Sequence, residues 1–143
     1  MEPLQRLTRR QVDALRTIAR HPAHDRGVPL NAIADGLGVS APSALGHLGP
    51  LEELGLIRRF RGKSMVTRRG RLCLDEYLRH HRVAENLFAR AGLSAHATHA
   101  AALEVDLALS HRTVQEICEA TGHPTQCPHG HPIGPCSPTE REG

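Results

Sequence analysis

The stretch VPLNAIADGLGVSAPSALGHLGPLEELGLI, residues 28–57, decides the fold of the first half of the chain. Apolar residues from Leu30 to Ala34 have the spacing of a short helix, and the segment from Gly36 to Val39 predicts a tight turn. Ser40 is a good N-cap for a second helix, and Pro42 falls in its first turn, where a missing N–H is tolerated. Two helices joined by a short turn are typical of a helix-turn-helix.

The second of these helices has an unusual composition for an element that reads DNA. Its N-terminal part would enter the major groove. No Arg, Gln or Asn lies between Ser40 and Leu51, so we expect modest base readout, with DNA shape and phosphate contacts supplying the rest. Gly46, Gly49 and Pro50 interrupt the pattern, and an interior proline costs about 3 kcal/mol, so the helix should kink or end near Gly49 unless packing offsets the strain. The residues of this helix expected to face DNA are Ser40, Pro42, Ser43 and His47.

The sequence on either side predicts the rest of a winged helix. Upstream, the segment from Gln11 to His21 places its apolar residues on one helical face. Downstream, RRFRGKSMVTRRGR (58–71) predicts two short strands around Gly62-Lys63 and then a long helix capped by Thr67. A solvated basic hairpin would look the same, but the position after a helix-turn-helix favours a wing that contacts phosphates. The wing residues expected to contact DNA are Arg58, Arg59, Arg61 and Lys63.

Charge and composition separate the two halves of the chain. From Met1 to Arg82 there are 15 Lys and Arg against 8 Asp and Glu, a net +7, and from Val83 to Gly143 there are 3 against 7, a net −4. Only 2% of the 143 residues are aromatic, which argues against a β-sandwich and against proteins that stack single-stranded bases on aromatic rings. No run approaches the roughly 20 apolar residues that cross a bilayer, and no signal peptide is recognisable, so we expect a cytoplasmic protein.

The second half concentrates side chains that bind metals. Seven of the eleven histidines and three of the four cysteines lie from His81 onward. His81 and Glu85 are four residues apart on one helical face, and His99 and Asp106 are seven apart on the next helix, which Ser94 should cap. Histidine with carboxylate suits Fe(II), Mn(II), Zn(II) or Ni(II). The alternative is an ordinary surface hydrogen bond between His81 and Glu85.

The end of the chain offers a second group of donors, with the pattern C-x8-C-x-H-x-H-x4-C. Its residues have the donor types of a tetrahedral zinc site or an iron–sulfur cluster, although the C-x2-C spacing of strong zinc motifs is missing. The alternative is an ordered Pro/Gly turn that packs against the helices. Cys73 lies in an apolar helical stretch and is expected to be a buried small hydrophobe. The members of the second group are Cys118, Cys127, His129, His131 and Cys136.

Several segments together resemble the diphtheria toxin repressor and manganese transport regulator family of metal-dependent repressors. They are LRTI, LGVSAPSALGHLGPLEELGLI, VTRRGR, HRVAENLF, HAAALEVDLALS and GHPTQCPHGHPIG, and the likeness runs from about Gln11 to Gly134. The resemblance implies a homodimer whose winged helices bind palindromic operators when divalent metal is bound. The SH3-like domain of some members is not expected here.

The resemblance also implies which residues bind the metal. The family's ancillary site falls on His81, Glu85 and His99, all of which can coordinate. The four positions of its primary site fall on Asp13, Leu103, Asp106 and Leu107, so only the two aspartates keep a coordinating group. The resemblance therefore implies an intact ancillary site and a depleted primary site.

The expected fold is mostly α. We expect a winged helix-turn-helix over residues 1–72, a helical dimerisation and metal-binding domain over 73–136 and a disordered tail over 137–143. The function expected is that of a DNA-binding transcriptional regulator, a repressor rather than an enzyme, that responds as a homodimer to Fe2+ or Mn2+, or to Zn2+. The alternative is a metal- or iron–sulfur-binding interaction module of winged-helix shape with little sequence-specific DNA binding.

Overall fold

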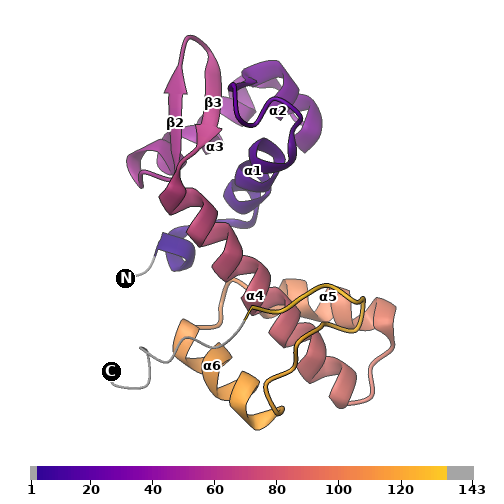
Figure 1. Cartoon of the computed structure of the whole chain (residues 1–143). Helices are drawn as coiled ribbons and strands as arrows, with labels where there is room; N and C mark the ends of the chain where they lie inside the picture. Colours follow the sequence, from indigo (N-terminus) through magenta and orange to yellow (C-terminus); the bar gives the residue numbers. More distant parts are fainter. Residues whose placement is uncertain (1–2, 135–143) are drawn as a thin grey trace. The chain divides into compact units, whose positions relative to one another are not determined.

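The computed structural model describes residues 3–134 and is mostly helical, as predicted (Figure 1). The chain divides into two units, one ending at Asp75 and the other beginning at Glu76, three residues beyond the boundary expected at residue 72. The tail expected to be disordered, residues 137–143, lies outside the described residues.

The first unit is a winged helix. Helices α1 and α2 both pack against α3, and a small sheet of strand order β1-β3-β2 completes the unit. Helix α1 begins two residues earlier than predicted because Thr8 and Gln11 form a capping box. The elements are the short 3-10 helix η1 (Pro3–Arg6), α1 (Arg9–Arg20), β1 (Val28–Pro29), α2 (Leu30–Leu37), α3 (Ala41–Glu53), β2 (Ile57–Phe60) and β3 (Lys63–Val66).

The predicted helix-turn-helix is present, and its second helix, α3, does not end near Gly49. Helix α2 ends at Gly38, which has a positive φ of 66°, and the Ser40 side chain accepts a hydrogen bond from the Ser43 backbone N–H at the start of α3. Helix α3 continues through Pro50 to Glu53. Leu48 and Leu51 beside the proline are fully buried, and burying a leucine contributes about 1.5–3 kcal/mol, so their packing offsets the roughly 3 kcal/mol cost of the proline.

The wing is the β2–β3 hairpin, which closes one residue earlier than predicted. Phe60 pairs with Lys63, so Arg61 and Gly62 form the two-residue turn instead of Gly62-Lys63. Both turn residues have positive φ, 50° and 74°, which is the conformation of a type I′ turn. Lys63 is thereby the first residue of β3.

The second unit contains most of the long helix α4 (Arg68–Arg90), followed by α5 (Ala95–Val105) and α6 (His111–Ala120). Thr67 and Ser94 cap α4 and α5 as predicted. The sequence pattern of residues 95–109 predicts one continuous helix, whereas α5 ends at Val105 and a further helix, α6, follows Ser110, which caps it by accepting a hydrogen bond from the Thr113 N–H. The apolar core of the second unit joins α4, α6 and the loop after α6. It consists of Val83, Val114, Cys118 and Ile133, with Leu109 and Ile117 packed against them.

Candidate metal centre

His81 on α4 lies at the centre of a buried polar cluster in the second unit. Its ring is held on one side by Asp106, whose Oδ2 lies 2.9 Å from His81 Nδ1. On the other side, His81 Nε2 lies 3.3 Å from Glu85 Oε1 and 3.3 Å from His99 Nδ1. The cluster therefore joins α4 to α5, as the spacing of these residues predicted.

The hydrogen bonds of His81 determine which ring nitrogen is available to a metal. An ionised carboxylate can only accept hydrogen bonds, so the neutral ring carries its proton on Nδ1 and donates it to Asp106. The lone pair of Nε2 then faces the Glu85 carboxylate and the His99 ring. A carboxylate that fixes the ring of a metal-binding histidine in this way is a common arrangement at metal sites.

Asp106 supports His81 and is not grouped with the metal donors. It is fully buried at the end of α5, and its Oδ2 accepts a second hydrogen bond, 3.0 Å long, from the Tyr77 hydroxyl. Asp13, the other aspartate expected at the primary site, lies on α1 in the first unit and lines a surface hollow of about 490 Å³ beside Arg10 and Arg16. Within residues 3–134, three groups of donors could each hold an ion, and neither aspartate belongs to any of them.

Glu85 is shared between two of these donor groups. The first contains His81, Glu85 and His99, and the second contains Glu85 with Cys127 and His129 from the loop after α6. The Glu85 side chain is only 3% exposed, and His129 Nδ1 lies 2.7 Å from its Oε2.

The contact between His129 and Glu85 is one that a cation would satisfy. His129 Nε2 lies 2.9 Å from the Ala95 carbonyl, which can only accept, so the neutral ring donates from Nε2 and turns the Nδ1 lone pair toward Glu85. Within the described part of the chain, Glu85 Oε2 accepts no hydrogen bond of good geometry. Two electron-rich atoms at this distance need a proton or a metal ion between them.

The donor distances fit a first-row divalent metal. Ligand bonds of about 2.0–2.2 Å place neighbouring ligand atoms about 3.0–3.6 Å apart, depending on the geometry. The two 3.3 Å separations at His81 Nε2 lie in this range. Imidazole and carboxylate suit iron, manganese and zinc, and the Cys127 thiolate would favour the softer of these ions.

The loop that supplies Cys127 and His129 is anchored to α4. Arg82 donates a 2.7 Å hydrogen bond to the Pro132 carbonyl, and Asn86 donates a 2.8 Å bond to the Gln126 carbonyl. Inside the loop, the Cys127 N–H donates to the His131 carbonyl. This segment is thus an ordered Pro/Gly turn and a donor segment at once, two properties that the sequence analysis treated as alternatives.

The structure does not bring the four described members of the predicted tail group together. Cys118 lies in the apolar core, with its Sγ 3.8 Å from His123 Nδ1, while the His131 side chain is exposed. Cys136 lies outside the described residues. Of the four predicted tail donors that the structure describes, only Cys127 and His129 join a donor group, and the third member of that group, Glu85, comes from α4. Cys73 is buried, as expected.

The third donor group, which consists of Glu76, His80 and His111, was not predicted from the sequence. Glu76 and His80 have the same four-residue spacing as His81 and Glu85, which was an available signal. His111 is the first residue of the helix α6 that was not foreseen.

The DNA-facing surface predicted in the first unit is largely accessible. Pro42 and Ser43 at the start of α3 are exposed, and His47 one turn later is half-buried. The Ser40 hydroxyl oxygen is engaged in capping α3. In the wing, Arg58, Arg61 and Lys63 are exposed and Arg59 is half-buried.

A winged helix joined to a helical unit with buried histidine, carboxylate and cysteine donors defines a class, that of DNA-binding proteins with a metal-binding domain. Residues 67–135 match the family model of the iron dependent repressor, metal binding and dimerisation domain. The predicted resemblance is confirmed, since this family model matches and the similar solved structures include metal-dependent transcriptional regulators. No curated protein sequence matches the chain.

Three solved structures illustrate the relationship. A hypothetical protein from Sulfolobus solfataricus is 26% identical, with a TM-score of 0.84 over 90% of this chain and 99% of that one. IdeR of T. acidophilum is 25% identical, with a TM-score of 0.64 over 92% of this chain and 63% of its own. A manganese-dependent transcriptional repressor in complex with manganese is 27% identical, with a TM-score of 0.69 over 90% of this chain and 63% of its own. The chain therefore spans less than two thirds of these two regulators.

None of the helices between residues 3 and 134 combines the length and the apolar character that a membrane span requires.

Proposed function

We propose that this protein is a metal-responsive repressor that binds duplex DNA as a homodimer, with Fe2+ or Mn2+ as the signal. The observation that carries the proposal is the Glu85 carboxylate, which is buried and shared by two donor groups that converge from α4, α5 and the loop after α6. The relatives support the choice of metal, since one of the similar structures is a manganese-dependent repressor bound to manganese.

In this proposal, some residues of the second unit bind the ion and others orient the residues that bind it. A bound ion would supply positive charge that joins the carboxylate and imidazole donors of separate segments. Asp106 keeps the His81 lone pair directed at the site, and the Ala95 carbonyl does the same for His129. An ion that binds one arrangement of these segments more tightly than others shifts the population toward that arrangement.

DNA binding is assigned to α3 and to the wing. The exposed start of α3 would read the major groove, while Arg58, Arg61 and Lys63 would contact phosphates. Because α3 presents hydroxyls, glycines and apolar groups rather than long donors, we expect DNA shape to contribute much of the specificity.

Homodimerisation is supported by apolar side chains that this unit leaves accessible. Leu87 on α4 and Leu103 on α5 are 37% and 39% exposed, and Leu93 between the two helices is 38% exposed. The matching family model describes a dimerisation domain. A second copy of the chain would cover these side chains.

The test is selection of DNA from a pool of random duplexes by anaerobically purified protein. It is run with Mn(II), with Fe(II), with Zn(II) and with a chelator, and sedimentation gives the oligomeric state. We expect Mn(II) or Fe(II) to enrich palindromic duplexes that a dimer binds, with affinity that falls as salt rises. Failure to bind any duplex under all four conditions would overturn the proposal and favour a metal-binding interaction module.

A matched pair of variants connects metal binding to DNA binding. His99→Ala removes a donor whose side chain is 57% exposed, and His96→Ala removes an exposed histidine that belongs to no donor group of the described chain. We expect only His99→Ala to lower metal affinity and metal-dependent DNA binding. The two donor groups that share Glu85 are together called the Glu85 centre. Equal metal affinity and equal DNA binding of the two variants would show that the Glu85 centre is not part of the mechanism.

A further inference from the structure

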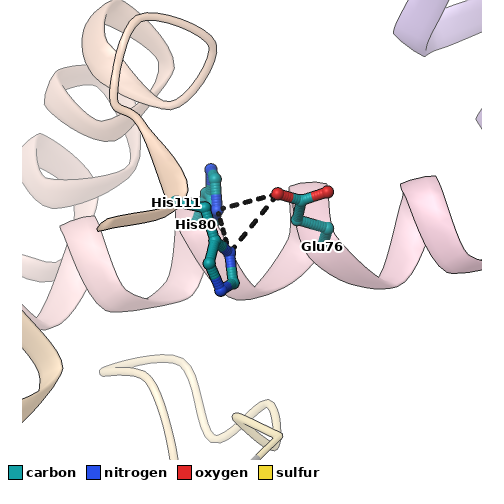
Figure 2. A group of neighbouring side chains, drawn as sticks. All are labelled: Glu76, His80 and His111. Atoms are coloured by element: carbon teal, nitrogen blue, oxygen red, sulfur yellow. Dashed lines mark hydrogen bonds and ion pairs between the residues drawn. The ribbon is translucent and has the colours of Figure 1, made fainter. Parts of the chain in front are cut away.

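The third donor group lies apart from the Glu85 centre. Glu76 and His80 occupy successive turns of α4, and His111 is the first residue of α6 (Figure 2). All three side chains converge in Figure 2, where the dashed lines join one carboxylate oxygen to both rings. Two helices distant in sequence thus present two imidazoles and a carboxylate to one point.

The three donor atoms form a nearly equilateral triangle. Glu76 Oε1 lies 3.6 Å from His80 Nε2 and 3.4 Å from His111 Nδ1, and the two ring nitrogens are 3.4 Å apart. A tetrahedral zinc ion with bonds of about 2.0–2.2 Å separates its ligands by about 3.3–3.6 Å. The triangle has the dimensions of one face of such a site.

Burial distinguishes this group from acids and histidines that meet on a surface. The His80 side chain is 1% exposed, and those of Glu76 and His111 are 21% and 18% exposed. The donors are mostly removed from water, and the partial exposure of Glu76 and His111 leaves an approach for the ion and for a fourth ligand. Two histidines and a glutamate with an open fourth position are an established zinc-binding set.

The group cannot share an ion with the Glu85 centre. His80 and His81 are consecutive residues of α4, so their side chains leave the helix about 100° apart. Glu76 and Glu85 are nine residues apart, a rise of about 13 Å along the helix. The third ligands also differ, since His111 belongs to α6 whereas His99 belongs to α5.

We propose that Glu76, His80 and His111 form a separate binding site for a zinc-like divalent cation, with water or an exogenous ligand in the fourth position. The ion would connect the first turn of α6 to the middle of α4. This site is independent of the proposed repressor function and of the metal that serves as its signal.

The experiment isolates the site by removing Glu85. The Glu85→Gln variant keeps the side-chain shape and weakens both other donor groups, because it removes the carboxylate that they share. The probes are Zn(II), counted by competition with a chromophoric chelator, and Co(II), whose visible absorption reports tetrahedral coordination. We expect Glu85→Gln protein to bind one ion per chain with a tetrahedral Co(II) spectrum. Adding His111→Ala should weaken Zn(II) binding by at least about 100-fold, since losing even an outer partner of a metal ligand costs 10–100-fold.

Two further variants keep the test decisive. If Glu85→Gln does not fold, His99→Ala combined with His129→Ala removes one donor from each of the other groups at more exposed positions. His96→Ala is the control for the loss of a histidine as such. Absence of a bound ion in the isolated site, or binding unchanged by His111→Ala, would overturn the proposal and leave a hydrogen-bonded cluster.

Discussion

Replacing Asp106 by asparagine should weaken metal binding at the Glu85 centre without removing a ligand. Asp106 is fully buried, and its Oδ2 accepts hydrogen bonds from His81 Nδ1 and the Tyr77 hydroxyl. An asparagine keeps the shape but loses the negative charge that fixes the His81 tautomer. Hydrogen bonds to charged groups contribute about 1.5–3 kcal/mol, and partners behind a metal ligand contribute 10–100-fold in affinity, about 1.4–2.7 kcal/mol, so the two magnitudes agree.

The assay is competition for Mn(II) and Zn(II) against a chromophoric chelator, with circular dichroism to verify the fold. We expect Asp106→Asn to bind the same number of ions, with the ion at His81, Glu85 and His99 held about 10–100-fold more weakly. Tyr77→Phe is the matched control, because it removes the hydrogen bond from the Tyr77 hydroxyl to Asp106 and leaves the one from His81. The reasoning fails if Asp106→Asn loses an ion outright, which would make Asp106 a direct ligand, or if its affinity changes by less than about tenfold.

Three further predictions concern the first unit. Arg61→Gly should raise the free energy of unfolding by up to about 1 kcal/mol, as measured in a denaturant titration. The left-handed backbone at this position costs a non-glycine residue about 1–2 kcal/mol, and the greater flexibility of glycine in the unfolded chain offsets part of the gain. Gly70→Ala should lower the free energy of unfolding by about 1–3 kcal/mol, because the added methyl group would overlap a neighbouring backbone carbonyl. The control is Gly46→Ala, whose methyl group would meet nothing within 4 Å and should not destabilise the protein; equal effects of the two substitutions would contradict this packing. Arg58→Ala should reduce the salt dependence of duplex binding by about one released counterion, and Arg112→Ala on α6 should leave the salt dependence unchanged. A reduced salt dependence in Arg112→Ala but not in Arg58→Ala would exclude the wing as the DNA contact.

Elements that depend on neighbouring residues could be predicted from the sequence. Ser40, Thr67 and Ser94 each begin a helix where their capping chemistry indicated, because the hydroxyl and the backbone N–H that it accepts from lie three residues apart. The wing was also predicted, but its turn was displaced by one residue because arginine rarely adopts the positive φ that Arg61 has.

Features that depend on distant contacts were predicted less well. The apolar pattern of α5 continues past Val105, so nothing local indicated that Asp106 ends the helix. Asp106 was expected as a ligand by its position in the family pattern, and no local pattern indicated its hydrogen bonds with Tyr77 and His81. The partner of Glu76 and His80 is 31 residues beyond His80, and no short motif relates such positions.

Between Glu76 and Gly134, helix α4 is the common partner of the donor segments that follow it. His99 on α5 and the loop residues Cys127 and His129 meet Glu85 of α4, while His111 on α6 meets Glu76 and His80 of α4. Both oxygens of Glu85 are in use, since Oε1 lies 3.3 Å from His81 Nε2, while Oε2 lies 2.7 Å from His129 Nδ1 and 3.8 Å from His99 Nδ1. An ion in one Glu85 group would therefore change the charge that the other group offers, and we expect binding at the two to be coupled. The α6 group has its own carboxylate, and we expect it to fill independently of that pair.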